Sequence, residues 1–197
     1  MRHAATLLAA ALLAAAAAFG ASALDPGRAQ AADTVNVKTC SGGKIALKVD
    51  EKRMLDLHNQ KRRSQELRRL CVHPALQRAA RDHSQDMIRD DYFTHGDVGK
   101  RLKRQGYNWS TYAENIALDP GSPSPGPTFD MWMDSQRHRD NITSRKFEEV
   151  GIGLATGSYR GERKTMWTAD FGSRSGEHHG QHGRQKHYFP HSLPPRC

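Results

Sequence analysis

Residues 150–155, with the sequence Val-Gly-Ile-Gly-Leu-Ala, constrain the fold more than any other segment. Apolar residues alternate with glycine, which predicts a strand whose glycines leave room for a helix or an aromatic ring to pack closely. Residues 165–171, after a turn region at 157–163, form a second alternating segment, which contains no glycine. The sequence therefore predicts an antiparallel pair of strands with a closely packed neighbour.

Three helical segments are predicted before these strands. Asp50 is a good N-cap residue, and the apolar periodicity after it predicts a helix that runs to about Leu67. Pro74 suits the first turn of a second helix, which ends at the polar segment 90–96. A short basic helix is predicted at 98–105, because the glycine that follows suits a left-handed helix end.

Residues 129–142 combine an apolar helix face with a polar run that contains His138. Three large apolar residues at the start of the segment have helical spacing, and Ser135 can cap a second short helix. His138 then lies near a helix N-terminus, which favours the neutral imidazole that binds metals. The alternative for the polar run is a solvated turn.

Glu114 lies between apolar neighbours and is expected to point inward. A buried carboxylate must be paired or bound to a cation, so the alternatives are an arginine partner and a metal ion. His58 and His83 lie on apolar helix faces, and we interpret both as packed histidines rather than ligands.

The N-terminus has the composition of a secretory signal peptide. Arg2 supplies positive charge, residues 4–19 form an apolar run that is short for a membrane span, and small residues follow. We expect cleavage after Ala31 or Ala32, and hence no transmembrane segment in the mature protein. The predicted organisation is a signal peptide at 1–32, an N-terminal arm at 33–49, a folded domain at 50–172 and a tail at 173–197.

The tail at 173–197 is rich in Gly, His, Arg and Pro and contains few apolar residues. Such a segment cannot bury enough surface to order itself, so we predict a disordered, basic, His-rich tail. Its histidines could collect metal loosely, although a solvated tail is the simpler interpretation. The fold is therefore expected to end near Phe171 or Gly172.

The formal net charge is +9. Loss of Arg2, Arg28 and Asp25 with the signal peptide removes two positive charges and one negative charge. An exported basic protein suits anionic cell-wall polymers or lipid head groups, whereas export removes most nucleic acid from reach. The basic charge can equally serve solubility alone.

Three cysteines occur, at Cys40, Cys71 and Cys197. A disulfide can persist outside the cytoplasm, and Cys40 and Cys71 flank the first predicted helix. We therefore predict a bridge between these two, with Cys197 unpaired. No pair of cysteines has the spacing of a zinc-binding motif.

Six ordered motifs between about Asp50 and Phe171 together resemble the CAP superfamily of cysteine-rich secretory, antigen 5 and pathogenesis-related proteins, and especially its bacterial SCP-domain members. They are LHNQKR at 57–62, HSQDM at 83–87, FTH at 93–95, ENIA at 114–117, WMDSQRHRDNI at 132–142 and EVGIG at 149–153. In the fourth motif, Ala113 replaces the glycine that the family has before the glutamate.

The resemblance implies an α+β fold, an α-β-α sandwich with a small central antiparallel sheet. It also implies a cleft with two histidines and acidic residues, which in some members binds zinc or another divalent ion. By position these residues are His95, His138 and Glu114. Many members have a second glutamate where this chain has Ser135, with Asp134 beside it.

Two functional classes follow from the resemblance. The first is a secreted, extracellular and monomeric binding module for a lipid, a cell-envelope component or a protein, with a metal-binding cleft. The second is a metal-dependent hydrolase, a peptidase or esterase, with zinc held by His95, Glu114 and His138 and an open position for water. We favour the binding module, because Glu114 cannot serve as both ligand and general base.

Overall fold

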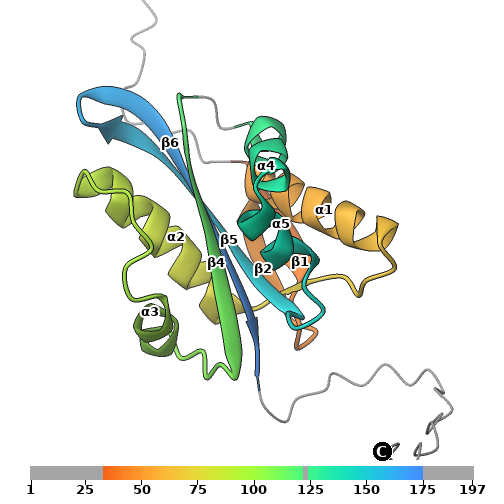
Figure 1. Ribbon diagram of the computed structural model, residues 1–197. Coiled ribbons are helices and arrows are strands. Elements are labelled where there is room, and N and C mark those ends of the chain that lie inside the picture. The colour runs from red at the N-terminus through yellow and green to blue at the C-terminus, as the bar shows by residue number, and fades with distance from the viewer. Residues whose placement is uncertain (1–32, 122–123, 175–197) are drawn as a thin grey trace, which may run out of the picture. The chain divides into compact units, whose positions relative to one another are not determined.

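The computed structural model describes residues 33–121 and 124–174. A four-stranded sheet forms its centre (Figure 1), with the strand order β3-β5-β6-β4. The strands are β3 (Cys71–Val72), β5 (Glu149–Tyr159), β6 (Glu162–Ser173) and β4 (Thr111–Asp119). β5, β6 and β4 pair antiparallel, as predicted, while the two residues of β3 pair parallel to the start of β5.

Helices cover both faces of this sheet. The first face carries α1 (Val49–Ser64), α4 (Pro125–Asp134) and α5 (Gln136–Thr143), whereas α2 (Pro74–Arg89) lies on the second with α3 (Val98–Arg104) beside it (Figure 1). A separate hairpin of β1 (Thr34–Lys38) and β2 (Lys44–Lys48) precedes α1. The fold is therefore the expected α-β-α sandwich.

The glycines of β5 let α2 approach the sheet. A Cβ atom on Gly151 would lie 2.1 Å from the carbonyl carbon of Leu76, and one on Gly153 would lie 2.1 Å from the carbonyl oxygen of Ala80. The intervening residue of β5, Ile152, faces the opposite side and joins the main core. This confirms that the alternating glycines mark a face on which a helix packs closely.

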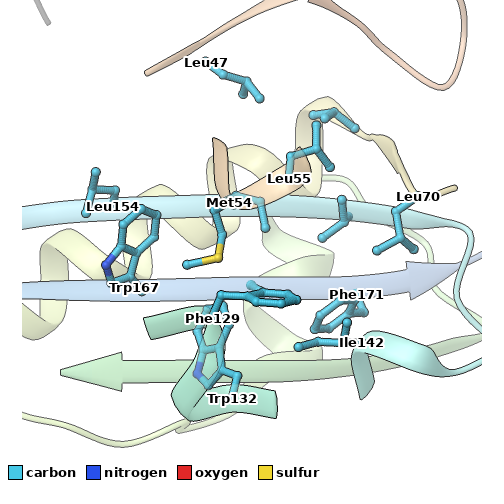
Figure 2. Close-up of a cluster of buried hydrophobic side chains, with 14 of the residues drawn as sticks. Leu47, Met54, Leu55, Leu70, Phe129, Trp132, Ile142, Leu154, Trp167 and Phe171 are labelled. Carbon is cyan, nitrogen blue, oxygen red and sulfur yellow. The ribbon is translucent and has the colours of Figure 1, made fainter. Parts of the chain in front are cut away.

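The main core fills the space between the sheet and the first helical layer (Figure 2). Met54 of α1 and Phe129 and Trp132 of α4 pack there against Trp167 and Phe171 of β6. His58 lies in the same core, with its ring 5.3 Å from that of Phe129. Burial lowers the pKa of His58 to about 4, so this histidine is a neutral packing residue, as predicted.

The first helix begins earlier than the sequence predicted. Lys48 is its N-cap residue, and Asp50 lies inside the first turn. The Lys48 backbone N–H donates to the carboxylate of Glu51 over 2.9 Å, and Arg81 of α2 pairs with the same buried carboxylate. The prediction was wrong because β2 runs directly into α1, so that a glutamate in the first turn replaces the capping side chain.

The predicted disulfide is present between Cys40 and Cys71, with a Cα–Cα distance of 5.1 Å. It joins the turn after β1 to β3, and the backbone N–H of Cys40 also donates to the Val72 carbonyl oxygen. The hairpin is thus attached to the sheet covalently and by backbone hydrogen bonds. Cys197, the predicted signal peptide and nearly all of the predicted tail lie outside the described residues.

Arg62, at the end of α1, is almost fully buried and joins two loops. Its guanidinium donates to the carbonyl oxygens of Arg68, Ile142, Ser144 and Phe147. The planar fork of arginine allows one side chain to satisfy four acceptors at once.

Among the described residues, no helix has the length and apolar character needed to cross a membrane.

Candidate functional site at the edge of the central sheet

Strand β4 lies at one edge of the sheet, and consecutive residues on it point to opposite faces. Glu114 points toward the side of α2 and α3, where it contacts Arg101 and His95. Asn115 points toward α5, where its side-chain amide donates to the carbonyl oxygen of His138 over 3.0 Å. The strand therefore positions groups from both helical layers around one sheet edge.

Glu114 is the hydrogen-bond acceptor that His95 and Arg101 share. Its side chain is 1% exposed. Its Oε1 lies 2.8 Å from Nδ1 of His95, and its Oε2 accepts from the guanidinium of Arg101. Arg101 also donates to the His95 carbonyl oxygen over 3.1 Å. An arginine and a carboxylate thus fix both the ring and the backbone of His95, whose side chain remains 50% exposed.

A second acid, Asp170, lies next to Glu114 on the neighbouring strand β6. It is opposite Glu114 in the β4–β6 register and is fully buried. Among the described residues no donor reaches its carboxyl oxygens, but the carboxyl group lies close enough to Glu114 for a hydrogen bond between the two acids when Asp170 is protonated. Burial, followed by the negative charge of Glu114, raises the pKa of Asp170 well above its usual range, so the neutral acid is favoured.

His83 of α2 lies near the carboxylate of Glu114. Its Nε2 lies 3.8 Å from Oε1 of Glu114, which is beyond hydrogen-bond distance. Burial is the main cause that lowers the pKa of His83. The neutral, packed histidine that the sequence predicted is therefore consistent with this position.

His138 comes from α5, on the other side of β4. Its Nδ1 is buried and has no hydrogen-bond partner among the described residues. Burial, and then the neighbouring charge of His95, lower the pKa of His138, which favours the neutral imidazole. Asn141 donates to Asn115 over 2.8 Å and completes the link between α5 and β4.

Ser135 is the N-cap residue of α5, as predicted, but its hydroxyl makes no capping hydrogen bond. The adjacent Asp134 is exposed at the end of α4. The structure thus brings His95 and Glu114 into direct contact and places His138 near enough to His95 for their charges to interact. It records no contact of Asp134 or Ser135 with these residues.

Sequence reasoning missed Arg101, Asp170 and Asn115. Arg101 was one basic residue among several in a helix predicted to be short and basic, and Asp170 was one polar position in an alternating strand. Asn115 adjoins Glu114 in the predicted motif, which was the one available signal. The arginine partner considered for Glu114 is confirmed, but the sequence alone could not select which arginine.

The α-β-α sandwich, with His95 and Glu114 in contact at the sheet edge, agrees with the fold and residues that the resemblance to SCP-domain proteins implied. The sequence profile of the cysteine-rich secretory protein family, CAP, matches residues 55–171. Because the match spans more than half of the chain, the chain belongs to this family.

Two relatives from Bacillus subtilis are similar in sequence. The uncharacterized protein YkwD is 33% identical over 126 residues, which cover 61% of this chain and 46% of YkwD. The uncharacterized membrane protein YlbC is 29% identical over 110 residues, which cover 53% of this chain and 31% of YlbC. The chain therefore spans less than half the length of either relative.

Solved structures agree on the fold. An extracellular protein from Bacillus anthracis that contains an SCP domain is 26% identical, with a TM-score of 0.54 over 62% of this chain and 40% of that protein. An outer surface protein from Borrelia burgdorferi is 16% identical, with a TM-score of 0.55 over 73% of this chain and all of that protein. At that identity the second likeness shows the fold alone.

Proposed function

We propose that this chain is a secreted, extracellular binding module whose cleft holds a divalent ion, most favourably zinc, through His95 and His138. The observation that carries the proposal is the His95–Glu114 contact. It occupies Nδ1 of His95 and leaves Nε2 as the nitrogen available to an ion. The unpartnered Nδ1 of His138 supplies a second donor, and neutral imidazoles suit zinc.

In this proposal Glu114 orients His95 and does not bind the ion. Both of its oxygens already accept, one from His95 and one from Arg101. A carboxylate that holds the second nitrogen of a ligating histidine is a common arrangement in zinc proteins. The proposal thus revises the role that the sequence suggested for Glu114, and keeps the two histidines as ligands.

The described residues contain one group of three potential ligands whose donor atoms all lie within 4.8 Å of one another, namely Cys40, Cys71 and Glu149. Both sulfurs of that group are in the disulfide, so it does not compete as a metal site. A thiolate, not a disulfide sulfur, is the form that binds metal. The two-histidine cleft is therefore the better candidate.

Exposed apolar side chains near the cleft support a ligand with an apolar surface, such as a lipid, a cell-envelope component or a protein. Phe93 precedes His95 by two residues and is 43% exposed. Tyr112 precedes Glu114 by two residues on the same face of β4 and is 37% exposed. Exposed apolar groups around a polar site are typical of binding surfaces.

The competing hypothesis, a metal-dependent hydrolase, requires a free general base beside the ion. Glu114 does not supply one, because both of its oxygens are engaged. Assays of peptide, ester and glycan hydrolysis with and without zinc separate the two hypotheses. Zinc-dependent turnover that is lost in His95→Ala would favour the hydrolase.

Calorimetric zinc titration tests the metal site directly. We expect one specific site in the parent protein, its loss in His95→Ala and in His138→Ala, and its retention in a His178→Ala/His179→Ala control.

Glu114→Gln should weaken the affinity by about 10- to 100-fold. Affinity should fall as the pH decreases, because a ligating imidazole must be neutral, and the burial that lowers the pKa of His138 moves its protonation below the ordinary value of about 6.5. If both single variants bind zinc as tightly as the parent, the cleft is not a metal site.

A further inference from the structure

Three cations form one exposed face of α3. Lys100, Lys103 and Arg104 are all exposed and have the spacing i, i+3 and i+4, which places them on the same side of the helix. The opposite side of α3 is buried through Gly99 and Leu102. We call the exposed set the α3 cationic face.

No carboxylate forms an ion pair with the α3 cationic face among the described residues. The acids nearest in sequence or contact have other partners: Asp97 accepts from the backbone N–H of Lys100, and Asp82 accepts from the side chain of Gln105. Glu114 is taken by Arg101 on the buried side of the helix. Three positive charges therefore face solvent without a matched charge.

Aromatic residues hold this face in place. The ammonium group of Lys103 lies 5.0 Å from the ring centroid of Trp109, a cation–π contact. The indole N–H of Trp109 donates to the carbonyl oxygen of Gly99 over 3.1 Å, and Tyr112 packs edge-on against the Trp109 ring at 4.6 Å. Lys103 is thus positioned before any ligand arrives, which reduces the entropy lost on binding.

We propose that the α3 cationic face binds a linear polyphosphate-type polymer with one negative charge per repeating unit. Residues at i, i+3 and i+4 have Cβ atoms about 5–6 Å apart, so their long side chains can reach successive charges of such a chain. A membrane surface is less suited, because Trp109 is packed against α3 and Tyr112 is the one aromatic side chain beside the face that is exposed among the described residues.

This inference is independent of the metal site, because it uses neither His95 nor His138. The variant for the test is Lys100→Gln/Lys103→Gln/Arg104→Gln, since glutamine retains helix propensity without the charge. The matched control, Arg63→Gln/Arg145→Gln/Lys146→Gln, removes the same charge from three other exposed positions. All three proteins are used as full chains, so that the basic tail contributes equally to each.

The probe is long-chain inorganic polyphosphate, with triphosphate and anionic phosphatidylglycerol vesicles as comparison ligands. We expect the α3 variant to bind polyphosphate at least tenfold more weakly at about 0.1 M salt. Affinity falls as salt rises, so the slope of log affinity against log salt is negative. In the α3 variant this slope should be less steep by about 2 units, as for three lost contacts to a flexible polyanion. The control should retain most of the parent affinity.

Three results would overturn the proposal. Equal losses in the two triple variants would mean that binding follows net charge alone. Equal affinity for triphosphate and for the long polymer would point to a small-anion site. Binding to the vesicles without binding to polyphosphate would assign the face to a membrane. Zinc titration of the α3 variant should match that of the parent, which separates this test from that of the cleft.

Discussion

Glu114 is the residue at which the described parts of the site meet. It contacts a loop histidine and a helix arginine, and it lies opposite a second acid on the neighbouring strand. Removing one partner of a buried ion pair leaves the other charge uncompensated, which is costly. Arg101 and Glu114 therefore depend on each other, and His95 depends on both for its orientation.

Asp170 provides a prediction about pH. Its folded-state pKa is raised, so the folded protein keeps a proton that the unfolded chain begins to lose near pH 4. The stabilisation is complete below that pH and is lost as the pH rises through the folded-state pKa. Relative to Asp170→Asn, the free energy of unfolding of the parent should decrease as the pH rises from 4. The slope against pH should correspond to at most one proton, which the folded protein binds and the unfolded chain does not.

Urea unfolding of the two proteins at a series of pH values measures this difference. Comparing parent and variant cancels the contributions of titrating groups that do not interact with Asp170, so the difference reports Asp170 together with its neighbour Glu114. A difference in free energy that stays constant from pH 4 to pH 8 would show that Asp170 is ionised in the folded protein.

At the scale of elements, the contact between α2 and β5 has no spare room. Gly153→Ala would place a methyl group against the backbone of Ala80, and the backbone cannot move aside as a flexible side chain could. We expect a loss of about 3 kcal/mol or more in the free energy of unfolding, measured by urea denaturation.

Gly126→Ala is the matched control for this substitution. Gly126 is in α4, and a Cβ atom there would contact nothing within 4 Å. Because Pro127 follows, a Cβ at position 126 is somewhat disfavoured in the helical conformation, so we expect a change of no more than about 1 kcal/mol, far smaller than that of Gly153→Ala. If Gly153→Ala behaved like Gly126→Ala, the close approach of α2 would be disproved.

The Cys40–Cys71 disulfide allows a second prediction at this scale. Its cysteines are 31 residues apart, and the chain-entropy relation assigns a bridge over such a loop about 4 kcal/mol. Cys40→Ser/Cys71→Ser should lower the free energy of unfolding by roughly that amount. Unchanged unfolding midpoints with and without reductant would contradict a stabilising role for the bridge.

The sequence predicted elements better than it predicted contacts. The β5–β6 pair and the glycine end of α3 follow from local patterns, because turn chemistry and alternation act over a few residues. The disulfide could be predicted because the chain has few cysteines and two of them flank the first helix. The capping at Lys48 and the partner of Glu114 depend on chain segments far apart in sequence. Periodicity contains no information about which distant arginine a buried carboxylate will meet.

At the scale of the whole molecule, the predicted end of the fold can be tested by truncation. Arg174 donates to the buried carboxylate of Glu149 over 2.8 Å, so it belongs to the folded part. A chain that ends at Arg174 should keep the melting temperature of the full chain. A chain that ends at Ser173 should lose about 2 kcal/mol, the contribution of a charged hydrogen bond.

Thermal unfolding of the three chains distinguishes the outcomes. If the chain that ends at Arg174 melts far below the full chain, residues after it contribute to stability. If the two truncated chains melt together, Arg174 adds nothing to the fold.

The alternation of Glu114 and Asn115 on β4 has a consequence for folding errors. A slip of β4 by a single residue against β6 would exchange the two side chains and turn the amide toward Arg101 and the carboxylate toward α5. Such a molecule could keep most of its secondary structure and still lack the contacts of Glu114 with His95 and Arg101. The hydrogen-bonded His95 ring, visible by nuclear magnetic resonance, would then report correct assembly in cases where circular dichroism could not.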